Sequence, residues 1–176
     1  KARSFEVADV VLKLNQRLLI DAEESWYQDV VDTLSYELMI KCNTERATVY
    51  NTYQFYRRDM LDKMKAGFEK MSTSKVHFGA KIVRGAYMEQ ERFRAQSLGY
   101  PDPIQPNKEA TDRDYNAGVK FAMENLTHFS FCLGTHNEAS SKGLVELMQQ
   151  YGCEKNDERI FFAQLLGMSD NISFKL

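Results

Sequence analysis

The sequence predicts an α/β fold in which parallel strands and crossover helices form a partial (β/α)8 TIM-type barrel. Short runs rich in β-branched and aromatic residues alternate with longer segments whose apolar residues recur every three or four positions. The intervening segments are long enough for right-handed crossovers. A Gly-x-Gly-x-x-Gly turn after the first strand is absent, so an open dinucleotide-binding sheet is the less favoured alternative.

Five strands are expected along the chain, each ending in or running into polar residues or glycine. Their ranges are 17–22, 48–53, 78–84, 129–135 and 160–166. Helical stretches separate them, as parallel strands require. No linker divides the chain, so a single domain is the economical interpretation.

Several of the helical stretches carry an apolar face that is expected to pack on the sheet. These faces consist of Val30, Leu34 and Leu38, then Tyr115, Val119, Ala122 and Leu126, and finally Leu144, Met148 and Tyr151. Residues 98–107 contain all three prolines, so a loop between two helices is expected there.

The composition is that of a globular domain, since 43% of the 176 residues are apolar and 27% are charged. Lys and Arg total 23 against 25 Asp and Glu, which argues against a nucleic-acid partner. The three cysteines are scattered, so neither a disulfide framework nor a zinc site is indicated. No apolar run reaches the roughly 18 residues of a membrane span.

Polar residues or glycine occur at the carboxyl end of every expected strand. In parallel sheets these ends meet at one edge, where ligands bind. Capping explains one such end, whereas five together favour a functional rim. His136, between Thr135 and Asn137, can hydrogen-bond a cofactor there. No metal is expected, because the rim has no second histidine and no His-x-His pair.

Three further rim positions indicate chemistry by residue type. Lys81 faces either the helices or the barrel interior, where it would need a carboxylate or an electron-rich ligand. Arg84 precedes Gly85 and Ala86 at the start of a helix, a combination that suits a phosphate. Asp21 is either a catalytic or orienting carboxylate or the cap of the next helix.

The stretch 78–92, Phe-Gly-Ala-Lys-Ile-Val-Arg-Gly-Ala-Tyr-Met-Glu-Gln-Glu-Arg, closely resembles the signature of proline dehydrogenases (proline oxidases), particularly the mitochondrial eukaryotic type. Further stretches resemble that family in the same order, at 19–24, 50–54, 99–104, 135–138 and 164–173. The resemblance therefore extends over nearly the whole chain.

This resemblance implies a flavoprotein of proline catabolism with a distorted (β/α)8 barrel and non-covalently bound FAD. The implied reaction oxidises L-proline to 1-pyrroline-5-carboxylate by hydride transfer to flavin N5, and the electrons pass on to a membrane quinone. The implied location is mitochondrial, on the matrix side of the inner membrane, where peripheral association with the membrane is compatible with the family.

The resemblance also implies roles for individual residues. Asp21 and Lys81 are the implied catalytic residues, one ordering the substrate pocket and the other placing a positive charge beside the flavin ring. Bacterial relatives often have arginine at the lysine position, so the charge is kept here and the planar fork is lost. The implied cofactor-binding residues are Ala22, Asn51, Arg84, Gly85, Ala86, Thr135, His136, Asn137 and Leu165.

By the same resemblance, residues 1–176 are expected to be the carboxyl-terminal part of the catalytic domain, truncated at both ends, with strands four to eight. The final family helix with its pair of adjacent arginines is not in the sequence, so the isolated chain is expected to lack proline turnover. Open sheet edges predict self-association. Two alternatives stay open: a non-catalytic partial barrel that acts by association, and a hydroxyproline dehydrogenase.

Overall fold

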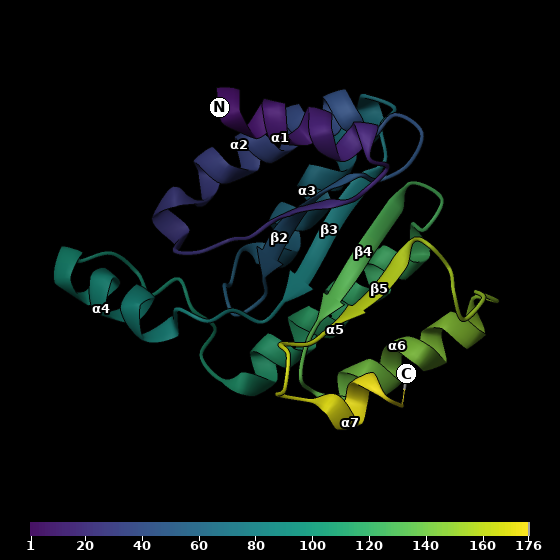
Figure 1. Cartoon of the computed structure of the whole chain (residues 1–176). Coiled ribbons are helices and arrows are strands. Elements are labelled where there is room, and N and C mark those ends of the chain that lie inside the picture. Colours follow the sequence, from purple (N-terminus) through teal and green to yellow (C-terminus); the bar gives the residue numbers. More distant parts are fainter. Residues whose placement is uncertain (176) are drawn as a thin grey trace.

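The computed structural model describes residues 1–175 and contains one sheet of five parallel strands. The sheet is curled, with helices along its convex side (Figure 1). The elements in chain order are α1 (Ala2–Lys13), β1 (Leu18–Ile20), α2 (Ser25–Cys42), β2 (Val49–Gln54), α3 (Met60–Thr73), β3 (Phe78–Val83), α4 (Met88–Leu98), α5 (Lys108–Glu124), β4 (Phe129–Gly134), α6 (Glu138–Gln150), β5 (Ile160–Ala163) and α7 (Asp170–Ser173). None of the helices within this part of the chain is long and apolar enough to cross a membrane.

The strands are ordered β1-β2-β3-β4-β5, so each pairs with the next strand in the sequence. An open doubly wound sheet reverses its strand order at a switch point, and this sheet has no reversal. The predicted partial (β/α)8 barrel, with five strands, is therefore confirmed. The two outer strands are shorter than expected, at three residues in β1 and four in β5. Each of them has a strand partner on one side only.

The strand register separates the two faces of the sheet. Thr52 lies opposite Lys81, and Lys81 lies opposite Cys132. Because side chains alternate along a strand, these three residues share the concave face. Their neighbours Ala80 and Phe131 belong to the hydrophobic core on the helix side. Lys81 therefore faces the interior of the curled sheet, which sequence alternation alone left open.

A cluster of aromatic side chains lies in the core between the sheet and the helices. The rings of Phe78 and Phe129, from adjacent strands, have centroids 4.9 Å apart. Phe68 from α3 lies 5.5 Å from the Phe129 ring and 5.6 Å from Phe121 of α5. Each such pair adds about 0.5–1.5 kcal/mol beyond the burial of its area. The predicted apolar face is buried, as expected: Tyr115, Val119 and Ala122 lie on α5, and Leu126 lies just after it.

Two residues of the predicted apolar helix faces are exposed instead. Val30 is 73% exposed, because α2 turns Gln28 and Ser35 toward the interior, where Ser35 donates a hydrogen bond to Asn51. Polar partners on β2 thus override the apolar periodicity of this helix. Tyr151 is also exposed, since α6 ends at Gln150 and the tyrosine lies at its C-cap.

The concave side of the sheet is filled at the amino ends of the strands. Arg17, just before β1, donates a hydrogen bond to the Glu158 carbonyl (3.2 Å), and its guanidinium lies 4.3 Å from the centroid of the Phe161 ring. Phe161 in turn packs edge-on against Tyr50. These contacts link the segment before β1 to β5 across the concave side.

A pair of histidines at the amino ends of β3 and β4 gives a pH-dependent stability. The rings of His77 and His128 have centroids 5.5 Å apart. Burial lowers the pKa of His77, and the nearby His128 lowers it further. The folded protein therefore binds this proton less tightly than the unfolded chain does. Its contribution is fully present above the ordinary pKa of 6.5 and is lost as the pH falls through that value toward the lowered folded-state pKa.

Replacing His77 by Asn is accordingly expected to flatten the stability curve on its acid side. Urea unfolding of the wild type should show a free energy of unfolding that falls between about pH 7 and pH 5, and His77→Asn should reduce that fall. An unchanged pH dependence in the variant would contradict the assignment to this residue.

Candidate functional site

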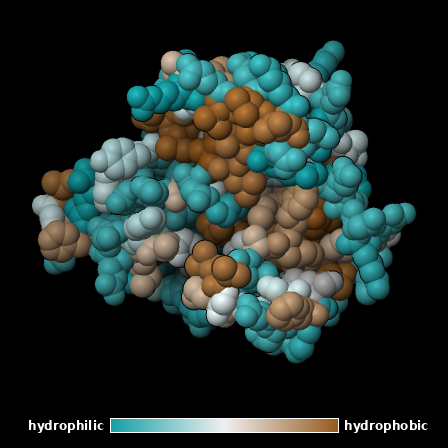
Figure 2. Space-filling model, viewed as in Figure 1, coloured by the Kyte–Doolittle hydropathy of each residue, from teal (hydrophilic) through white to brown (hydrophobic). Residues whose placement is uncertain are grey.

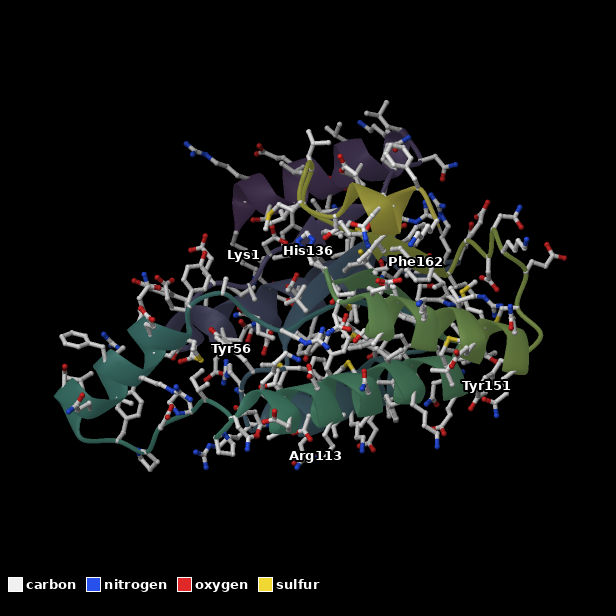
Figure 3. All side chains as sticks on the ribbon, turned by 90° about the horizontal axis from the view of Figure 1, so that it is seen from below. Lys1, Tyr56, Arg113, His136, Tyr151 and Phe162 are labelled. Atoms are coloured by element: carbon white, nitrogen blue, oxygen red, sulfur yellow. The ribbon has the colours of Figure 1, made fainter. Side chains whose placement is uncertain are left out.

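The carboxyl ends of the five strands meet at one rim, at the end of the sheet away from the Arg17 contacts. Figure 3 labels two residues of this rim, Tyr56, which follows β2, and His136, which follows β4. Most of the residues predicted for the site lie in the loops that leave these strands. The rim is built from segments far apart in the sequence, because the strands are parallel and consecutive.

An ion pair lies on the concave face near this rim. Lys81 of β3 donates a hydrogen bond to Asp21 Oδ1 at 2.6 Å. Asp21 is the first residue after β1. The lysine side chain is 24% exposed and the aspartate side chain 70%, so the pair contributes no more than about 1 kcal/mol to stability. Beside them, burial raises the pKa of Cys132 to about 11. The lysine thus has the carboxylate partner that its position requires and remains open to the concave side.

Arg84 is the most connected residue of the rim. Its Nε donates to Asp112 at 2.7 Å, its Nη1 to Thr135 and its Nη2 to Ser140, each at 2.9 Å. The guanidinium also lies 4.1 Å from the centroid of the Tyr115 ring. Because a guanidinium carries five N–H groups, each Nη keeps a second hydrogen beyond these contacts. The group is oriented by its neighbours and can still donate to an anion.

Asp112 balances the charge of this arginine. Burial alone would raise the pKa of the Asp112 carboxyl, but hydrogen bonds from Lys108 and Arg84, with their positive charges, lower it below its ordinary value. The carboxylate therefore stays ionised and fixes the Nε side of the guanidinium. The two Nη atoms face the start of α6.

Gly85 follows the arginine in a conformation that side chains disfavour, with φ of +125°. A Cβ atom here would lie 2.5 Å from the ring of Tyr56. The backbone of the same loop is tied to that residue, because the Tyr56 N–H donates to the Arg84 carbonyl at 2.6 Å. The following Ala86 is exposed. Because Gly85 has no side chain, the backbone of this loop is exposed there.

The loop from β4 into α6 is held by its own polar side chains. Asn137 caps α6 by accepting from the Ser140 N–H at 3.0 Å, and Thr135 Oγ1 accepts from the Asn137 N–H at 3.1 Å. His136 Nδ1 lies 2.8 Å from Ser169 Oγ, and its Nε2 accepts from the Leu165 N–H at 3.4 Å. Leu165 has an exposed side chain. These contacts join the β4 and β5 loops at the rim.

The side chain of Asn51, a predicted site residue, does not lie on the concave face of the sheet. It is fully buried, its Nδ2 donates to Asp32 at 2.7 Å, and its Oδ1 accepts from Ser35 of α2. Its side chain therefore points to the helix side of β2. Asn51 is an implied cofactor-binding residue by the resemblance, but the register pairs it with Ala80 and not with Lys81, so its side chain does not share the face of Lys81.

The concave positions of β2 nearest the rim are Thr52 and Gln54, which sequence reasoning missed. Thr52 donates to the Ile20 carbonyl at 2.8 Å, and Gln54 donates to the Glu23 carbonyl at 2.6 Å. Gln54 thereby ties the end of β2 to the loop that carries Asp21. Alternation along the strand was the available signal, but its phase depended on knowing which residue pairs with Lys81.

Comparisons with known proteins agree with this architecture. The family model described as proline dehydrogenase matches residues 1–176. Human mitochondrial proline dehydrogenase 1 is 38% identical over 181 residues, which cover 99% of this chain and 30% of that protein. Hydroxyproline dehydrogenase of Xenopus laevis is 33% identical over 164 residues, covering 91% of this chain and 35% of that protein. The chain thus spans about a third of the length of these relatives.

A solved structure shares the fold. The crystal structure of proline utilization A from Bdellovibrio bacteriovorus, inactivated by N-propargylglycine, matches with a TM-score of 0.81 at 23% sequence identity. The match covers 89% of this chain and 16% of that chain. The curled sheet with its helices is therefore an arrangement that occurs within a longer protein.

Proposed function

The chain belongs to the proline dehydrogenase family, and on that premise we propose that it forms the FAD-binding part of an enzyme that oxidises L-proline to 1-pyrroline-5-carboxylate in proline catabolism. The observation that carries the proposal is the Arg84 cluster, an oriented guanidinium with free N–H groups beside a bare glycine loop. These residues sit at the same rim as the Lys81–Asp21 pair.

The five strands correspond, in this proposal, to the fourth to eighth strands of an eight-stranded barrel. The length of the human relative, of which the chain covers 30%, supports it. So does the exposed apolar surface between α1 and the strands in Figure 2, which further strands would cover. The outer edges of β1 and β5 favour self-association, and a partial barrel that acts by association is the alternative.

The residues at the rim fit the phosphate-bearing part of FAD. Arg84 supplies two free N–H groups, and the loop at Gly85 and Ala86 lets a ligand approach the backbone. Thr135, His136 and Asn137 stand at the start of α6, where the helix dipole favours a pyrophosphate. The adenosine would lie next to that pyrophosphate. The proposal also includes Ala22, in the segment after β1, and Leu165, in the segment after β5. Asn51 is not included.

Lys81 and Asp21 act on the reacting end of the site. Bound FAD would supply N5 as the acceptor of a hydride from the proline carbon next to nitrogen, and pass electrons to a membrane quinone. Lys81 would place a positive charge beside the negative charge that grows on a bound flavin during its reduction. Asp21 keeps the ammonium group in place and borders the substrate pocket. Orientation and charge are the contributions of the protein.

The setting follows from the relatives. Similar proline dehydrogenases are named mitochondrial, which supports a mitochondrial location. A place on the matrix side of the inner membrane, with peripheral contact to it, is the finer part of the proposal. The similarity to a hydroxyproline dehydrogenase favours a second candidate substrate, hydroxyproline. Reduction of the bound flavin by each amino acid in the longer enzyme would distinguish the two.

A flavin series tests the proposal directly. The chain is expected to bind FAD most tightly, FMN about tenfold more weakly and riboflavin about tenfold more weakly again, because each step removes phosphate contacts. Fluorescence titration of the three flavins measures these affinities. Equal binding of riboflavin and FAD would contradict the assignment of Arg84 and the α6 start to phosphates.

A further inference from the structure

Glu91 is a fully buried carboxylate away from the described site. It lies in the first turn of α4, where its Oε1 accepts from the Ser25 N–H at 2.5 Å and its Oε2 accepts from Ser25 Oγ at 2.6 Å. A carboxylate removed from water is costly unless it is hydrogen-bonded. Here both oxygens are satisfied by one residue that lies 66 positions earlier.

The partner of this carboxylate is the start of another helix. Ser25 is the first residue of α2, and the N-cap residue Glu24 makes no side-chain capping bond. Glu91 therefore caps α2 from a different element, and its negative charge lies at the end of the helix that favours it. Within α4, Glu91 and Ala95 are the buried residues, so this contact is a principal attachment of the helix.

The two helix starts follow two loops of the rim. Residues 21–24 connect β1 to α2 and contain Asp21, whereas residues 84–87 connect β3 to α4 and contain Arg84 and Gly85. A bond between the helix starts therefore fixes the two loops relative to each other. The Lys81–Asp21 pair spans the same gap but is partly exposed, so it constrains the loops less.

We infer that Glu91 is a positioning residue that holds the loop of Asp21 and the loop of Arg84 in one arrangement. The side-chain hydrogen bonds found for it within residues 1–175 go to Ser25, which is not a predicted cofactor residue, so it acts through Ser25. The consequence for cofactor affinity rests on the proposed function, whereas the link between the loops does not.

A second contact between the same helices provides the control. The Arg94 guanidinium of α4 lies 4.3 Å from the centroid of the Trp26 ring in α2, at the surface. Arg94→Gln removes this contact and leaves Glu91 in place. Glu91→Ala removes the buried cap, and Glu91→Gln keeps an acceptor for the Ser25 N–H and a donor for Ser25 Oγ.

Hydrogen exchange of the 176-residue chain without cofactor is the first readout. Glu91→Ala is expected to speed exchange at least about tenfold in peptides covering residues 21–28 and 84–90, with β3 and β4 unchanged. Glu91→Gln should restore most of the protection, and Arg94→Gln should match the wild type. Exchange that rises equally in Arg94→Gln, in one loop only, or throughout β3 and β4 would overturn the inference.

FAD titration of the same variants is the second readout. Glu91→Ala is expected to weaken FAD binding about tenfold, and Glu91→Gln to bind within about threefold of the wild type. If the wild type binds no FAD, the proposed function fails while the exchange result still decides the role of Glu91. If Glu91→Ala does not fold, Glu91→Gln against Ser25→Ala provides the comparison, and equal protection in both would overturn the inference.

Discussion

Replacing Arg84 by Gln is expected to lower the affinity of the chain for FAD at least about a hundredfold, or about 2.7 kcal/mol. The substitution removes the free N–H groups on both Nη atoms and the positive charge that faces the start of α6. It also leaves the Asp112 carboxylate without its arginine partner, so a negative charge remains where phosphates would bind. Fluorescence titration with FAD measures the change.

Arg113 supplies the matched control for this substitution. It lies on α5 next to Asp112, is largely exposed and pairs with Asp114 at 2.9 Å. Arg113→Gln therefore changes the net charge equally and leaves the rim intact. The account predicts wild-type affinity in this variant. Equal FAD affinities in Arg84→Gln and Arg113→Gln would remove Arg84 from the site.

Gly85→Ala is expected to destabilise the chain by about 3 kcal/mol and to weaken FAD binding as well. The added Cβ would lie 2.5 Å from the ring of Tyr56, which is buried, and φ of +125° is unfavourable for alanine. The loop must therefore shift, and Arg84 shifts with it. Urea unfolding measures the loss of stability.

Gly99 is a control position that separates the effect of backbone strain from the effect of the steric contact with Tyr56. It also has a positive φ, of +71°, but a Cβ there meets nothing within 4 Å. Gly99→Ala is expected to cost about 1 kcal/mol through backbone conformation alone and to leave FAD binding unchanged. Similar losses in both variants would show that the contact with Tyr56 does not matter.

The sequence was sufficient to predict that the chain forms five parallel strands. Alternation of strand-like and helical segments predicted five parallel strands, and the structure confirms them. Boundaries at the outer strands were less predictable, because pairing on one side lets β5 end at Ala163 and not at residue 166. Val30 was misplaced because the interior face of α2 is set by polar contacts to Asn51, which hydropathy does not register.

The sequence was sufficient to predict which loops carry the site residues, but less so to predict on which face of the sheet each side chain lies. Positions after each strand placed Arg84 and His136 at the rim, as the parallel arrangement requires. The orientation of Asn51 depended on strand register, which a single strand does not reveal. The partners of Arg84, at Asp112 and Ser140, lie 28 and 56 residues away, so no local pattern indicates them. Glu91 and Ser25 were hidden for the same reason.

Retention of FAD by the chain tests the central claim most directly. The 176-residue protein would be expressed as written, loaded with FAD and desalted, and its visible absorbance spectrum recorded. The account predicts a bound flavin spectrum that survives desalting in the wild type and is lost in Arg84→Gln. Folded, desalted wild-type protein without flavin absorbance would contradict it and favour a partial barrel that acts by association alone.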